Sequence, residues 1–94
     1  AVAEAVTVYF PPEARQTMMC VAWYESSYKP GVTGALGERG LLQILLDDST
    51  LPLIRQLGYT PEQMWEGWPN IHVGSEMWRT RGLQPWLAQK GRCW

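Results

Sequence analysis

The segment from Pro12 to Ser26 constrains the fold most, because it predicts a helix that is apolar on almost every side. Pro11-Pro12-Glu13 is typical of a helix start, since proline suits the first turn and glutamate favours the positive end of the helix dipole. The middle, residues 17–24, reads Thr-Met-Met-Cys-Val-Ala-Trp-Tyr and carries no charge. We therefore expect this helix to lie at the centre of the molecule, enclosed by the rest of the chain.

The length leaves room for one domain, residues 1–94, because a second core of usual size would not fit into 94 residues. Hydrophobic residues make up 46% and charged residues 18%, which excludes a disordered chain and a coiled coil. No apolar run approaches the ~20 residues that a bilayer-spanning helix needs, so no membrane insertion is expected. A net charge of −1 argues against a nucleic-acid partner bound through phosphate contacts.

The remainder of the chain predicts short helices and turns. Residues 27–40 are rich in Gly and Pro and predict a loop or a small β-hairpin. A capped helix is expected from about residue 48 to 58, a short one after the capping box that begins at Thr60, and another from Pro69 to Gly82. The fold class is therefore expected to be α+β and predominantly helical, with a central buried helix and a short β-hairpin or loop region.

The two cysteines, Cys20 and Cys93, either form one disulfide or remain as two buried free thiols. A disulfide would tie down the C-terminal end, stabilise the fold by about 2–4 kcal/mol and indicate an oxidising setting. Two cysteines and the lone His72 are too few for a structural zinc site, so no metal is expected. The chain begins at Ala1 without Met, which fits either a processed mature chain or a domain cut from a longer one.

Glu25 carries the strongest chemical signal in the sequence. Three apolar residues precede it on the same helical face: Ala14, Met18 and Val21. Glu25 thus ends a buried stripe at the C-terminal end of the central helix, where burial and the helix dipole both disfavour a charged carboxylate. We expect a raised pKa and a proton retained near neutral pH, as a general acid requires. The alternative is a side chain that turns into water as the helix ends.

Glu25-Ser26, a glycine-rich loop and then Gly40-Leu41-Leu42-Gln43-Ile44 resemble the lysozyme superfamily. The similarity is to the soluble lytic transglycosylases, the goose-type lysozymes and many phage lysozymes. Pro69-Asn70-Ile71, with Gly74 and Trp78, is similar to the Asn-Ile-x-x-Gly helix of that family. The resemblance covers residues 12 to 94, and the order and spacing of the motifs make it specific although each motif alone is weak.

The resemblance implies a lysozyme (muramidase) or lytic transglycosylase that cleaves the β-1,4 bond between N-acetylmuramic acid and N-acetylglucosamine in peptidoglycan. Glu25 would protonate the bridging oxygen, and Glu38 would be the second catalytic carboxylate, as a stabilising group or a base. Otherwise Glu38 is a solvated turn residue. The family's Ala-Tyr-Asn motif is absent, and Gly82-Leu83-Gln84-Pro85-Trp86 occupies its place, which puts the transglycosylase subtype in doubt.

Four further residues are candidates for substrate binding: Ser26, Tyr28, Gln43 and Trp86. Ser26 would orient Glu25 or touch the substrate, and Gln43 would donate to a sugar hydroxyl or N-acetyl group. Tyr28 would line the groove, and Trp86 would stack on a sugar ring. The structural alternatives are a helix-end hydroxyl for Ser26 and an amide bonded to loop backbone for Gln43, whereas Asn70 is expected to be structural.

The expected partners are the glycan strands of peptidoglycan, acted on by a monomer without a cofactor. The expected location is extracellular or periplasmic, either secreted or associated with a phage. A second hypothesis is a catalytically inactive lysozyme-fold module that binds the cell wall, and a third is a disulfide-held protein-interaction domain. Clearing of purified cell walls separates the first hypothesis from the other two.

Overall fold

In the computed structural model, which describes residues 1–94, helix α2 (Pro12–Ser26) has the bounds that the sequence predicts. Its inner face is completely enclosed, with Met18, Val21 and Ala22 showing no exposed surface. The helix ends at Ser27, whose backbone takes the left-handed conformation and donates its N–H to the carbonyl of Trp23. Trp23 and Tyr24 of the same apolar segment are each 49% exposed. The helix is therefore buried on one face only, and the expectation that the rest of the chain encloses it on almost every side is wrong.

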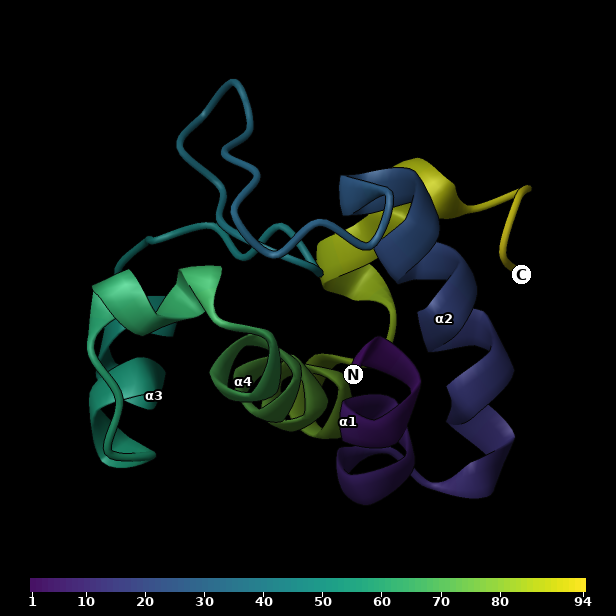
Figure 1. The fold of residues 1–94 in the computed structure, drawn as a ribbon, viewed down its shortest axis with the longest axis horizontal. Coiled ribbons are helices and arrows are strands. Elements are labelled where there is room, and N and C mark those ends of the chain that lie inside the picture. The colour runs from purple at the N-terminus through teal and green to yellow at the C-terminus, as the bar shows by residue number, and fades with distance from the viewer.

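Helix α1 (Val2–Tyr9) is an element that the sequence analysis does not predict. It packs against α2 and α4 and buries Ala5 and Val6 in the core, with Val2 and Tyr9 partly buried beside them (Figure 1). These four positions follow the spacing i, i+3, i+4 and i+7 of an amphipathic helix. The spacing is therefore a signal that the sequence does contain.

Four short or medium helical segments complete the fold: α3 (Thr50–Gln56), the 3₁₀ helix η1 (Pro61–Trp65), α4 (Gly67–Arg81) and the 3₁₀ helix η2 (Gln84–Gln89). Helix α4 lies at the centre of the view in Figure 1, with α1 and α2 on one side and α3 on the other. It begins two residues before the expected Pro69 and ends where the sequence predicts, before Gly82. No helix is long and apolar enough to cross a membrane.

The segment between α2 and α3 contains no sheet, so the fold is helical and the expected β-hairpin is not formed. Two isolated antiparallel bridges pair Arg39 with Thr33 and with Ile44. Gly34, Gly37 and Gly40 interrupt this stretch, and glycine weakens a strand because it has no side chain to pack. The loop alternative is what the structure contains, and this loop projects beside the C-terminal end of α2 (Figure 1).

A disulfide joins Cys20 to Cys93, with a Cα–Cα distance of 5.6 Å, which confirms the predicted pairing. The guanidinium of Arg92 lies 4.9 Å from the ring centre of Tyr24 on the same helix. Together with the contacts of η2, these interactions fasten the C-terminal segment to the second half of α2. That half of the helix ends at Glu25 and Ser26.

Candidate active site

Glu25 lies in the last turn of α2, where the buried helix reaches the surface. The neighbouring Ala22 and Ser26 are buried, whereas Trp23 and Tyr24 are each 49% exposed. Glu25 itself is half-buried. Its carboxyl group is thus partly removed from water and still accessible, which is the position that a proton donor to a bound substrate needs.

The pKa of Glu25 is raised above its ordinary value of 4.5, as the sequence predicts, and burial is the largest cause. The side-chain amide of Gln89 opposes this rise, because its Nε2 donates to Glu25 Oε2 over 3.1 Å and favours the charged form. The negative charge of Glu38 raises the pKa further. Burial and a second acidic side chain therefore both contribute to the raised pKa of Glu25.

Glu38 lies on the loop that faces the acid. Its Oε1 accepts a hydrogen bond of 2.7 Å from the backbone N–H of Leu36, which fixes the carboxylate locally. A methyl group at Gly34 would collide with Glu38 Oε1 and with Gln43 Oε1. These two oxygens therefore lie around the same point of the loop, and glycine at position 34 leaves the space for them.

Arg39 does not pair with the adjacent Glu38. Its guanidinium lies 3.9 Å from the ring centre of Trp65 and donates from Nη1 to the carbonyl of Pro61 over 2.8 Å. The loop is thus attached to η1 through Arg39, and Glu38 forms no ion pair.

The side chains of Ser26 and Gln43 both form hydrogen bonds to backbone carbonyls, which is the structural role given above as the alternative to substrate binding. Ser26 is 5% exposed, and its Oγ lies 2.9 Å from the carbonyl oxygens of Ala22 and Leu41. Gln43 Nε2 donates to the carbonyls of Val32 and Gly40, over 3.2 and 3.1 Å. The expected donation from Gln43 to a sugar is therefore replaced by bonds inside the loop, and the Ser26 hydroxyl is not exposed to a substrate.

The expectation that Trp86 stacks on a sugar ring is wrong. Trp86 is 2% exposed and belongs to the core, and its indole N–H donates to the carbonyl of Leu42 over 2.9 Å. A tryptophan in a short Pro-Trp turn gives the same sequence pattern whether its ring faces inward or outward. Here the ring lies beside Gly74 of α4 and bonds to Leu42 of the loop, and these tertiary contacts are not visible in the sequence.

The exposed aromatic rings near the acid are on α2 and directly after it. Tyr28 is 38% exposed, its ring lies 5.3 Å from that of Trp23, and its hydroxyl donates to the carbonyl of Met19 over 3.1 Å. Tyr24 is the third exposed ring of this group. Met19 and Trp23 are one helical turn apart on one face of α2, whereas Glu25, two residues after Trp23, points to a different side. The contacts of Tyr28 therefore place it on the face of Met19 and Trp23, and the expectation that it lines a groove with the acid stays a prediction.

Asn70 is a structural residue, as expected. It has no exposed surface, and its Oδ1 accepts from the N–H of Leu42 over 3.0 Å. Its Nδ2 donates to the carbonyls of Arg39 and Met64, over 2.8 and 2.9 Å. A methyl group at Gly40 would collide with Met64 O and Asn70 Nδ2, and Gly40 also has a φ of +78°. Asn70 thus holds the Gly-Leu-Leu-Gln segment against α4.

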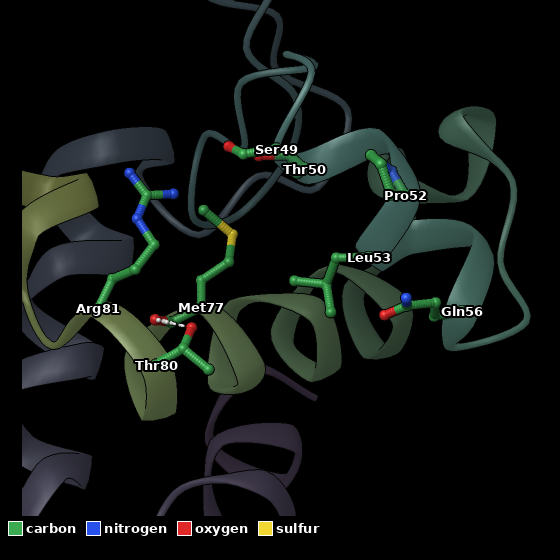
Figure 2. Close-up of a pocket in the computed structure, with 8 residues that line it drawn as sticks. All are labelled: Ser49, Thr50, Pro52, Leu53, Gln56, Met77, Thr80 and Arg81. Atoms are coloured by element: carbon green, nitrogen blue, oxygen red, sulfur yellow. Dashed lines mark hydrogen bonds between the residues drawn. The ribbon is translucent and has the colours of Figure 1, made fainter.

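The pockets of the molecule lie away from the acid, because none of the three is lined by Glu25. A pocket of about 280 Å³ lies between α3 and the C-terminal end of α4, and Figure 2 shows the Arg81 side chain beside it. A smaller pocket of about 90 Å³ shares Thr50, Met77 and Arg81 with it and reaches Gln43. Glu25 therefore lies at the surface outside these pockets.

No group of three or more His, Cys, Asp or Glu side chains lies close enough together to hold a metal ion.

The sequence matches no family model and no curated protein. The fold is similar to the crystal structure of the 70 kDa soluble lytic transglycosylase SLT70 from Escherichia coli, with a TM-score of 0.61 and 21% sequence identity. The similarity covers 94% of this chain and 18% of that chain, so this chain spans a small part of the other protein's length. The likeness supports the lysozyme-like fold that the motifs predict.

Proposed function

We propose that this chain is a glycosidase that cleaves the β-1,4 bond between N-acetylmuramic acid and N-acetylglucosamine in peptidoglycan, with Glu25 as the general acid. The observation that carries the proposal is the half-buried carboxyl of Glu25 at the C-terminal end of α2, with a raised pKa. Its place on a fold similar to that of a lytic transglycosylase supports the same reaction. A carboxylic acid that keeps its proton is the group that glycoside cleavage needs.

In the proposed reaction, protonated Glu25 donates to the bridging oxygen while the bond to the sugar carbon breaks. Positive charge then develops on that sugar ring, in an oxocarbenium-like transition state. The carboxylate of Glu38 would stabilise this charge or activate a water molecule. In hydrolysis the water adds to the ring, whereas in transglycosylation a hydroxyl of the same sugar closes a 1,6-anhydro product. We favour hydrolysis, because a second carboxylate faces the acid.

The surroundings of Glu25 suit a polymeric substrate. An acid at an open surface can reach a bond in the middle of a glycan strand, which an enclosed pocket would not admit. Trp23, Tyr24 and Tyr28 expose aromatic rings at the same end of α2 as the acid, and aromatic rings pack well against apolar faces of ligands. The disulfide between Cys20 and Cys93 fits an extracellular or periplasmic protein, because such bonds persist in oxidising compartments.

The test is the clearing of purified cell walls, followed by turbidity, with wild type and Glu25→Gln. We expect the variant to lose about 10³-fold in rate, because general acid catalysis contributes about 10²–10⁴-fold. Glu13→Gln is the matched control, since Glu13 is an exposed glutamate in the first turn of the same helix. Mass spectrometry of the products should show reducing ends rather than 1,6-anhydro ends.

Two results would contradict the proposal. A Glu25→Gln variant that clears walls as fast as wild type would remove Glu25 from the reaction. A wild-type protein that sediments with cell walls and never clears them would identify a cell-wall-binding module without turnover. Far-ultraviolet circular dichroism of each variant shows whether the fold is intact.

A further inference from the structure

Gln89 is the side chain that hydrogen-bonds to Glu25, and none of the sequence motifs accounts for it. It is the last residue of η2 and is 6% exposed. Its Nε2 donates to Glu25 Oε2 over 3.1 Å, whereas its Oε1 is buried and has no hydrogen-bond partner in the protein. A buried amide with only one end satisfied is costly, which indicates that its position serves the group it faces.

The backbone holds Gln89 firmly at this place. Its carbonyl accepts hydrogen bonds from the N–H groups of Arg92 and Cys93, both of 3.0 Å. Cys93 is bonded covalently to Cys20, which precedes Glu25 by five residues on α2. The amide and the acid are therefore connected through one short turn, one disulfide and a little more than one turn of helix. This connection fixes the distance between Gln89 and Glu25.

A primary amide can serve both protonation states of a carboxyl group. The ionised carboxylate only accepts hydrogen bonds, so it pairs with the amide N–H group, whereas the carboxylic acid also donates and pairs with the amide oxygen. Rotation of the amide by half a turn exchanges these two ends, which have nearly the same size. Oε1 has no partner in its present position, so the rotation breaks no bond on that side.

We propose that Gln89 is the positioning residue of the acid, with an amide that donates to the Glu25 carboxylate and accepts from the Glu25 carboxylic acid. The inference rests on the proposed function and deepens it, because a proton donor must be held in one place before and after it gives up its proton. No proton passes to Gln89. The amide fixes the direction of the carboxyl group toward the glycosidic oxygen.

The first test follows the titration of Glu25 by ¹³C NMR of its carboxyl carbon, assigned by comparison with Glu25→Gln. In Gln89→Met the midpoint should move to higher pH, because the bond to the charged carboxylate is the stronger of the two and is lost. In wild type, the side-chain amide signals of Gln89 should titrate with the same midpoint as Glu25 and remain constant in Glu25→Gln. Gln84→Met, a change of an exposed glutamine in the same 3₁₀ helix, should leave the Glu25 midpoint unchanged.

The second test measures kcat and KM on soluble glycan strands across pH. Gln89→Met should lower kcat on the acid plateau by about tenfold or more, since small misplacements of catalytic groups are costly, with KM within about twofold. The alkaline limb of the profile should move up by the same amount as the NMR midpoint. A plateau kcat equal to that of wild type would overturn the proposal, and so would amide signals that do not follow Glu25.

The two proposals fail in distinguishable ways. If wild type does not cleave glycan, the proposed function is wrong, and the NMR titration still decides whether Gln89 and Glu25 act on each other. If Gln89→Met does not fold, Gln89→Glu retains the length and the polar end of the side chain. It should raise the Glu25 midpoint further, because two carboxyl groups at hydrogen-bond distance cannot both ionise easily. An unchanged midpoint in Gln89→Glu would also overturn the proposal.

Discussion

The two carboxylates of the candidate site are held in different ways. Glu25 lies on α2, whose inner face is completely enclosed and whose Cys20 is bonded covalently to the C-terminal segment. Glu38 lies on a loop whose only strand-like pairing is two isolated bridges, and nearby Leu36 is 76% exposed. The fold as a whole therefore places Glu25, whereas local backbone contacts place Glu38.

This difference corresponds to what the proposed cleavage reaction requires of each carboxyl group. A proton is transferred over hydrogen-bond distance, so the donor must be placed within about 3 Å of its target. A charge acts over a longer range, so the second carboxylate tolerates more movement. The helix and its disulfide hold Glu25 in the precise position that proton transfer requires. The loop holds Glu38 less tightly, which is sufficient for an interaction between charges.

Removal of the disulfide is expected to have the greatest effect on stability. It loosens the attachment of the C-terminal segment to α2, the helix that carries Glu25. The double variant Cys20→Ser, Cys93→Ser should lose about 4 kcal/mol of unfolding free energy, because the bond closes a loop with a sequence separation of 73. Urea unfolding measures this loss. Activity should also fall at temperatures where the variant is folded, because Gln89 is no longer held against Glu25.

Wild type and the double variant are compared with and without a reducing agent as the control. Reduction should destabilise wild type by a similar amount and leave the variant unchanged. An unfolding free energy that is the same in all four samples would show that contacts other than the disulfide hold the C-terminal segment.

Asn70→Ala is the matching test of the loop side. It removes three hydrogen bonds and takes away the partner of the buried N–H of Leu42 and of the carbonyl of Met64, whereas the carbonyl of Arg39 still accepts from the N–H of Ile44. We expect a loss of about 2–3 kcal/mol, typical of buried polar groups left unsatisfied. Faster hydrogen exchange at the N–H of Leu42 would locate the change in the Gly-Leu-Leu-Gln segment.

Gln56→Ala, a change of an exposed amide at the end of α3, is the control and should alter stability by less than about 0.5 kcal/mol. If Asn70→Ala unfolds at the same urea concentration as wild type, the loop is held by its own contacts rather than by α4. The contrast between the two carboxylates would then have to be revised, because the loop that carries Glu38 would be stable without the hydrogen bonds from Asn70.

The parts of the fold that depend on local signals could be predicted from the sequence. Helix α2 has a proline start and an uninterrupted apolar stretch, so its bounds follow from the sequence. The exposure of Trp23 and Tyr24 on its outer face does not follow, because an apolar stretch does not show which side the rest of the chain covers. Helix α1 has the same apolar spacing, but Ala1 at its start is not a capping residue, so its boundary carries no signal. The helix was therefore missed although its pattern is present.

The parts of the site that depend on tertiary contacts could not be predicted in the same way. The raised pKa of Glu25 follows from a helical stripe that the sequence shows, whereas its bond to Gln89 depends on how residues 84–94 fold back onto α2. The inward direction of Trp86 likewise depends on the carbonyl of Leu42 from another segment. No spacing rule connects residues so far apart in the chain.

The least drastic change is Glu38→Gln, which removes a charge and retains the shape of the loop. The charge of Glu38 raises the pKa of Glu25, so the pKa should fall in this variant. In the proposed reaction Glu25 acts when protonated, so activity should be lost as pH rises through its pKa. The alkaline limb of the pH profile should therefore move to lower pH, and the rate below that limb should fall by about threefold to tenfold.

Glu62→Gln, a change of an exposed glutamate on η1, is the control and should move neither quantity. A Glu38→Gln variant with wild-type rate and an unmoved limb would make Glu38 a solvated turn residue and leave Glu25 as the single essential acid. A shifted limb with an unchanged rate would separate two roles, since it would show that Glu38 sets the proton affinity of Glu25 without acting on the sugar. The loop would then influence the reaction through the helix alone.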